Sequence, residues 1–113
     1  MTNEELDALD EQVARLQGWQ CNLNGWWDAT INPKQGASPY DPRDYRECPS
    51  YTRDRALVGE LIDAVQMGSM IVCTRTNSCE VFDAGYCVFE VYEVDYQVGL
   101  CLALVWAKEQ DND

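Results

Sequence analysis

One stretch of the chain, from Trp19 to Pro49, limits where regular structure can form. All four prolines fall within it, together with two glycines and three of the four tryptophans, and hydrophobic periodicity is absent there. Irregular segments longer than about 12–15 residues are uncommon inside a compact domain. The tryptophans predict that this one is ordered against the rest of the protein, because large aromatic surface left in water is costly. We therefore expect a single domain over 1–113 with a long irregular loop at about 19–50.

The segment before this loop predicts a helix over 2–17. Thr2 and Glu5 form a capping-box pattern, in which each side chain accepts a hydrogen bond from a backbone N–H of the first turn. Gly18 stands where a left-handed residue would close the helix. Between these ends the apolar residues recur at helical spacing. This apolar stripe consists of Leu6, Leu9, Val13 and Leu16.

Two further helices are predicted after the loop. Thr52 is the expected N-cap of the first and Asp95 that of the second, because both side chains can accept a hydrogen bond from a free backbone N–H. Each segment carries apolar residues at helical spacing, which indicates one buried face per helix. The expected helices are 52–67, with Leu61 at the centre of its face, and 96–109, with Leu102 at the centre.

Three short segments between these helices are rich in β-branched and aromatic residues, which is typical of strands. They cover 69–76, 79–82 and 86–94. In the last of them Phe89 and Val91 alternate with Glu90 and Tyr92, so one face of the sheet is expected to be more apolar than the other. The predicted fold class is α+β, with helices packed on both sides of a small three-stranded, mainly antiparallel sheet.

Charge and composition exclude several functional classes. The chain has 20 acidic and 8 basic residues, a net charge of -12 and no histidine. Without imidazole, histidine-dependent catalytic triads and histidine-containing zinc sites are excluded. An acidic surface repels the phosphate backbone, so direct nucleic-acid binding is not expected. We expect no enzyme activity, no catalytic residues, no metal and no cofactor.

The six cysteines do not form a CxxC motif, and the N-terminal sequence is acidic where a secretory signal would be basic and then apolar. We therefore expect free thiols in a reducing cytoplasm, with Cys73, Cys87 and Cys101 buried as small apolar side chains. Disulfides and a metal site are the alternatives. No apolar run approaches the roughly 20 residues that a bilayer demands, so a soluble cytoplasmic protein without membrane contact is expected.

Four of the basic residues lie close together in the sequence and are interleaved with tyrosines. Together they could form a pocket for an anionic ligand such as a nucleotide phosphate. The alternative is that nearby acidic residues neutralise the arginines in local ion pairs, those residues being Asp41, Asp44, Glu47 and Asp54. The candidate pocket residues are Arg43, Arg46, Arg53, Arg55, Tyr45 and Tyr51, and Trp26 and Trp27 form a separate candidate apolar contact.

The acidic residues are concentrated near the two ends of the chain. If the first and last helices pack side by side, their outer faces form one negative surface. Such a surface could imitate the phosphates of nucleic acid on a basic partner. Simple solubility is the other explanation for the charge. The candidate partner-binding residues are Glu4, Asp7, Glu11, Glu90 and Glu93.

Three segments resemble, in the same order, the phage ABA sandwich domain family: MTNEELDALDEQVARLQGW, PSYTRDRALVGELIDAV and EVDYQVGLCLALVWAKE. The matching features are a Gly18-Trp19 pair after the first helix, a proline, tyrosine and threonine before the middle helix with Ser50 inserted, and Cys101 in the last helix. The last helix begins with Gln97-Val98 where family members commonly have alanine and proline. The resemblance implies helices flanking a sheet and a phage or prophage accessory role, with no general activity.

Charge and resemblance together predict a small acidic phage accessory protein that binds and inhibits a host defence or nucleic-acid-handling complex. It would act in the manner of an anti-CRISPR protein, by nucleic-acid mimicry. The expected partner is a host protein complex with a basic nucleic-acid-binding surface. Two alternatives stay open at this point. One is a ligand binder that sequesters a nucleotide signal, and the other is a structural or assembly accessory without inhibitory activity.

Overall fold

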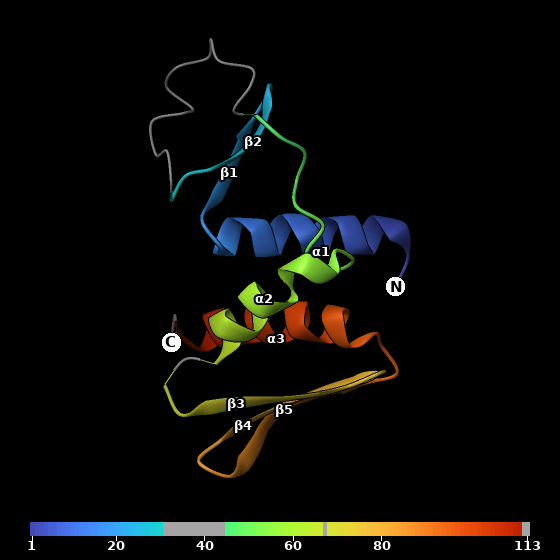
Figure 1. Cartoon of the computed structure of the whole chain (residues 1–113), viewed down its shortest axis with the longest axis vertical. Helices are drawn as coiled ribbons and strands as arrows, with labels where there is room; N and C mark the ends of the chain where they lie inside the picture. Colours follow the sequence, from blue (N-terminus) through green and yellow to red (C-terminus); the bar gives the residue numbers. More distant parts are fainter. Residues whose placement is uncertain (31–44, 67, 112–113) are drawn as a thin grey trace.

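The computed structural model describes residues 1–30, 45–66 and 68–111. Figure 1 shows them in layers, with a two-stranded hairpin and α1 above α2 and α3, and a three-stranded sheet below. The α+β class is confirmed. The elements are α1 (Asn3–Leu16), β1 (Trp19–Asn22), β2 (Gly25–Asp28), a 3-10 turn η3 (Arg55–Leu57), α2 (Val58–Val65), β3 (Met70–Arg75), β4 (Ser78–Asp83), β5 (Tyr86–Tyr92) and α3 (Tyr96–Asp111).

The three strands β3, β4 and β5 form an antiparallel sheet in that order. They coincide with the three predicted strand segments apart from one or two residues at the ends. β5 carries one extra residue, Val88, because Val81 pairs with Phe89 whereas Phe82 pairs with Cys87. A bulge of this kind locally increases the twist of the sheet.

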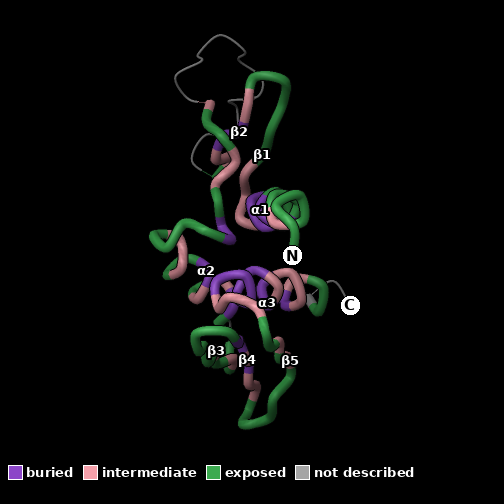
Figure 2. Tube along the Cα trace, turned by 90° about the vertical axis from the view of Figure 1, so that its right-hand side faces the viewer, coloured by how far each residue is buried: buried purple, intermediate pink, exposed green. Residues whose placement is uncertain are grey.

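The arrangement of the helices differs from the prediction, since the described helices lie on one side of this sheet only. α3 packs on β4 and β5, α2 packs on β3, and α1 lies on the far side of α3 (Figures 1 and 2). The reason is the composition of α3. Val98, Leu100, Cys101 and Ala103 are buried, and at 100° per residue their directions together span more than half of the circumference of the helix. A helix that is apolar on several sides has to be covered from several sides.

The N-terminal helix α1 forms as predicted. Thr2 and Glu5 form the capping box, and Gly18 follows the helix with a φ of +95°. Leu9, Val13 and Ala14 are buried on the side of α1 that packs against α3. The helix therefore begins and ends at local signals, and its apolar stripe sets which side faces the core.

The expected irregular loop is wrong in its first part, because residues 19–28 form the β1–β2 hairpin. The backbone N–H of Asn24 donates to the side chain of Asn22 at 2.8 Å in the turn. Arg46 extends this small sheet through a bridge to Trp26, with backbone N···O distances of 2.8 and 2.9 Å. Asn24-Gly25 between aromatic segments is a hairpin signal in the sequence, although the turn itself is Leu23-Asn24, because Asn22 pairs with Gly25.

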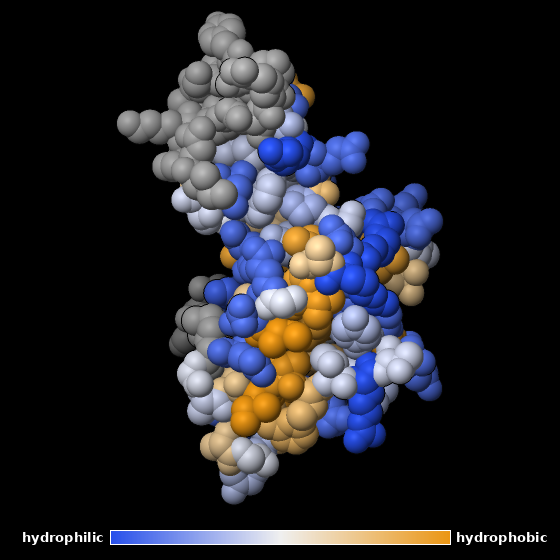
Figure 3. Space-filling view, in the orientation of Figure 1, coloured by the Kyte–Doolittle hydropathy of each residue, from blue (hydrophilic) through white to orange (hydrophobic). Residues whose placement is uncertain are grey.

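The second helix is shorter than predicted. α2 begins at Val58, after the 3-10 turn, and its C-cap is Gln66. Thr52 is not an N-cap. Its backbone N–H donates to Asp10 at 2.7 Å, and Asp54 caps the 3-10 turn through the N–H of Ala56. Figure 3 shows apolar side chains over α2 and down to the sheet, where Leu57, Val58 and Ile62 are half-buried.

Two glycines in helices provide a matched test of this packing. A Cβ at Gly99 of α3 would lie 2.6 Å from Cβ of Cys79 in β4, whereas a Cβ at Gly59 of α2 would meet nothing within 4 Å. We expect Gly99→Ala to lower the free energy of unfolding by about 1–3 kcal/mol through overpacking. Gly59→Ala should raise it by about 0.5–1 kcal/mol through helix propensity. Urea denaturation measures both, and a stabilising Gly99→Ala would contradict the close approach of α3 to β4.

Candidate interaction surface

The five candidate acidic residues are all exposed, but the structure divides them between two places. Glu4, Asp7 and Glu11 lie on α1. Glu90 lies on β5, and Glu93 directly follows it. α1 packs on α3 as the charge hypothesis supposed. However, Glu90 and Glu93 belong to the sheet on the other side of α3 (Figure 1), so they form a second acidic region rather than a continuation of the first.

On α1, Asp7 forms an ion pair with Arg53, and Asp10, which was not among the candidates, is buried and binds the same arginine. The Arg53 guanidinium donates to Asp7 at 2.5 Å and to the buried Asp10 at 3.0 Å. The hydrogen bonds that Arg53 donates to these two aspartates raise its pKa. Asp10 also accepts the backbone N–H of Thr52. Arg53 therefore ties the segment before α2 to α1.

The remaining candidate arginines do not converge on a pocket. Arg55 pairs with Asp95 through two N···O distances of 2.9 and 3.1 Å, and its guanidinium stacks on the ring of Tyr96 at 4.5 Å. Arg46 takes part in the bridge to Trp26, and Arg43 lies outside the described residues. Arg53 and Arg55 thus form ion pairs, which was the alternative to an anion pocket. Their partners are aspartates far away in the sequence and not the acidic residues beside them.

The candidate tyrosines also have structural roles. Tyr51 is buried in the core, and its pKa is raised by burial and then by a hydrogen bond to Glu60. The ring of Tyr45 lies edge-on to Trp27, with centroids 5.9 Å apart, and its hydroxyl accepts from Asn22 at 3.3 Å. Neither tyrosine meets Arg53 or Arg55 in a common pocket among the residues that the structure describes.

The candidate apolar contact at Trp26 and Trp27 is not on the surface, since both side chains are buried. The Arg15 guanidinium lies 5.1 Å from the ring centroid of Trp26. These two tryptophans hold the β1–β2 hairpin against α1 and Tyr45. The prediction that these tryptophans pack against the rest of the protein is confirmed, and the prediction that they form an exposed apolar contact for a partner is wrong.

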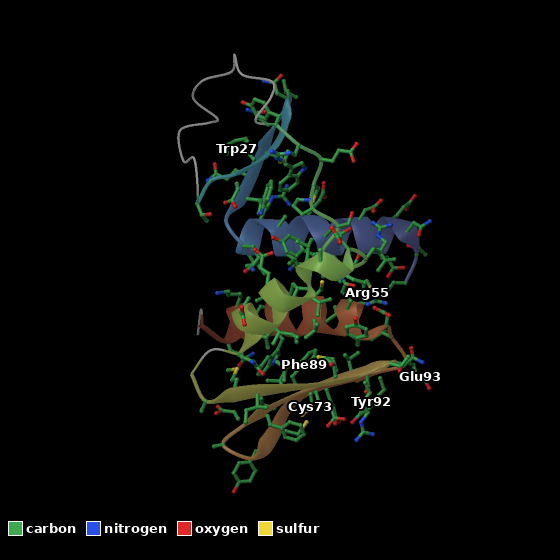
Figure 4. All side chains as sticks on the ribbon, in the orientation of Figure 1. Trp27, Arg55, Cys73, Phe89, Tyr92 and Glu93 are labelled. Carbon is green, nitrogen blue, oxygen red and sulfur yellow. The ribbon has the colours of Figure 1, made fainter. Side chains whose placement is uncertain are left out.

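The surface that sequence reasoning missed is the sheet face turned away from the helices, which we call the open face. Phe89 points toward α3, whereas Cys73 and Tyr92 lie on the opposite side of the sheet (Figure 4). Strand alternation and register place on the open face Ile71, Cys73, Arg75, Ser78, Glu80, Phe82, Cys87, Glu90 and Tyr92, with Val88 at the bulge.

Large apolar side chains are unusually exposed around this face. On this face Ile71 is 60% exposed and Tyr92 53%, and Val88 at the bulge is 40% exposed. Tyr86, which is 77% exposed, starts β5 and alternates with Cys87 to the other side of the strand. Scattered exposed apolar residues are normal, but a contiguous group on one face marks an interaction surface. The alternation within β5 carried this signal in the sequence.

The burial of the cysteines agrees with the exposure of this face and corrects the prediction that Cys73, Cys87 and Cys101 are all buried. All six are free, and Cys101 is buried as expected, but Cys73 and Cys87 are exposed and Cys79 is buried instead. Burial raises the pKa of Cys79 to about 11. The error follows from the uncovered face, since Cys73 and Cys87 lie on the side that no described helix covers.

Acidic groups dominate the electrostatics of the open face. Tyr92 donates from its hydroxyl to Glu90 at 3.1 Å, and this bond, partial burial and the charge of Glu80 raise the pKa of Tyr92 to about 12. Desolvation and the charges of Glu90 and Glu80 also raise the pKa of Cys87. The face is therefore apolar at one end and negative at its centre.

The fold and this surface define a small α+β protein with an uncovered sheet face. No family model matches the chain, and neither a curated protein nor a solved structure does so. The resemblance to the phage ABA sandwich domain family therefore stays a prediction.

Within residues 1–30, 45–66 and 68–111, no three Cys, Asp or Glu side chains are grouped to hold a metal ion. The described helices do not include one with the length and apolar character needed to cross a membrane.

Proposed function

We propose that this protein acts by binding, without catalysis, and that its partner is a protein with a basic surface that otherwise contacts nucleic acid. By covering that surface the protein would inhibit a host defence or nucleic-acid-handling complex. The phage setting and cytoplasmic location of this proposal rest on the sequence resemblance and composition alone.

The observation that carries the proposal is the state of the charged side chains. Glu4, Glu11, Glu90 and Glu93 are exposed, and no ion pair within the described residues engages them. The net charge of -12 therefore acts outward from the surface. A field of this kind accelerates association with a basic partner and repels nucleic acid.

The nucleotide-binding alternative receives less support. It requires several arginines to converge on one phosphate, and instead Arg53 binds carboxylates of α1 and Arg55 binds Asp95, directly before α3. Their hydrogen bonds connect α1, the segment before α2 and the start of α3. Substituting them would therefore test stability more than ligand binding.

Capture from bacterial lysate followed by competition tests the proposal. The partner captured from the lysate is purified and bound to a fluorescent DNA duplex. The acidic protein is then added, and the release of the duplex from the partner is followed by fluorescence anisotropy. We expect displacement that weakens with salt, and a loss of about tenfold at low salt for Glu90→Lys with Glu93→Lys.

Asp63→Lys with Glu109→Lys is the matched control, because it changes the net charge equally at exposed positions on α2 and α3. It should weaken displacement much less. A captured partner with an acidic surface, or displacement independent of salt, would contradict the proposal. An ultraviolet-absorbing small molecule copurifying with the protein would favour the ligand binder.

A further inference from the structure

The open face combines apolar and charged residues in rows that run across the three strands. Directly paired residues form an apolar row of Ile71, Phe82 and Cys87, and a central row of Cys73, Glu80 and Glu90. The third row contains Arg75, Ser78 and Tyr92. No described element covers these rows, because α2 and α3 lie on the other side of the sheet (Figures 1 and 4).

The central row holds two like charges side by side. Glu80 and Glu90 are direct partners across β4 and β5, where side chains stand about 5 Å apart. Like charges at this position are destabilising. Within the described residues, neither carboxylate forms an ion pair with a basic side chain. A cation placed over the row would relieve this repulsion, and the apolar row beside it would gain from burial.

Charge distinguishes between the possible occupants of this face. In a symmetric dimer the same patch contacts itself, so a second copy would set four carboxylates, Glu80 and Glu90 of each copy, against only two Arg75 side chains and join two chains of net charge -12. A basic partner meets complementary charge at the same place. The partner therefore has to present positive and apolar side chains together.

We propose that the open face binds an amphipathic helix of the partner, with Lys or Arg and apolar residues one turn apart on the same side. This inference rests on the proposed function and names its contact surface. Successive rows of the sheet lie about 7 Å apart, and helix residues i and i+4 lie about 6 Å apart along the helix axis. An apolar side chain of the helix can therefore face the apolar row while a basic side chain one turn away faces the central acidic row. A six-residue strand such as β4 spans about 20 Å, the length of about 13 helical residues.

A synthetic helical peptide of about 14 residues, with Leu and Lys one turn apart on one face, is the probe. Alkylation of the native cysteines reports where it binds, because Cys73 and Cys87 lie on the open face and the exposed Cys21 lies on the β1–β2 hairpin. We expect the peptide to protect Cys73 and Cys87 and to leave Cys21 reactive. A peptide of the same composition without an apolar face should protect none of them.

Charge-removing variants distinguish docking of the peptide on the open face from a general electrostatic attraction between the basic peptide and the acidic protein. Glu80→Gln with Glu90→Gln should weaken peptide binding about tenfold by calorimetry. Asp63→Asn with Glu109→Gln removes the same charge from α2 and α3 and should change binding less than about twofold. Equal weakening by both variants, or protection of Cys21 equal to that of Cys73, would overturn docking on this face while leaving the proposed function standing.

The oligomeric state completes the test. A dimer by analytical ultracentrifugation, with Cys73 and Cys87 protected in the free protein, would overturn the inference in favour of a second copy. Peptide docking on the open face without displacement of nucleic acid from any captured partner would instead support this contact surface and contradict the proposed inhibition.

Discussion

We expect Leu104→Ala to lower the free energy of unfolding by about 2–5 kcal/mol. Leu104 is fully buried in the core cluster, in the helix that lies between the sheet and α1. Truncation there loses the transfer free energy of the removed methyl groups and leaves a cavity bounded by packed elements on several sides. A loss of this size is a large part of the stability of a domain of this length.

Urea denaturation with a matched control measures this effect. Leu61→Ala should cost a similar amount, because Leu61 is fully buried in α2. Leu102→Ala should cost clearly less, because Leu102 is only half-buried although the sequence pattern placed it at the centre of its helix face. If Leu102→Ala proves as costly as Leu104→Ala, the orientation of α3 described above is wrong.

We also expect Asp10→Ala to lower the free energy of unfolding by about 3 kcal/mol. The carboxylate of Asp10 is buried, accepts the N–H of Thr52 at 2.7 Å and pairs with Arg53 at 3.0 Å. Removing it leaves a buried backbone donor without an acceptor, which costs about 1–3 kcal/mol, and loses a charge-assisted hydrogen bond of similar size.

The control for this prediction is Asp7→Ala, since Asp7 binds the same guanidinium at an exposed position. Exposed ion pairs contribute about 0–1 kcal/mol, so the two aspartates should differ by about 2 kcal/mol or more. Thermal and urea unfolding monitored by circular dichroism provide the comparison. Equal losses would show that Asp10 is not the buried acceptor for the segment before α2.

The parts of the fold that follow from neighbouring residues were predictable from the sequence. The capping box of Thr2 and Glu5, the glycine after α1 and the three β-rich segments all act within a few residues. The β1–β2 hairpin had a local signal too, at Asn24-Gly25, but the prolines further along led to an irregular segment being predicted instead. The start of α2 was misplaced because Thr52 satisfies Asp10 instead of capping a helix.

The candidate surface was predictable only in part. The alternation of Phe89, Glu90, Val91 and Tyr92 shows that β5 has two different faces. Whether the second face is covered depends on where the other helices pack. α1 is drawn to α3 and not to the open face, because α3 offers apolar surface on several sides and the open face carries Glu80 and Glu90 at its centre.

The sequence alone determines the acidic charge, the absence of histidine chemistry and the order of the three helices and of β3, β4 and β5, because these depend on composition and on local periodicity. Only the tertiary structure decides which charges meet. Arg53 binds Asp7, 46 positions away, and Arg55 binds Asp95, 40 positions away, while Asp54, which lies between the two arginines in the sequence, accepts the backbone N–H of Ala56. An ion pair forms wherever packing brings opposite charges within a few ångströms, and for residues in different helices or strands the separation along the chain does not set that distance.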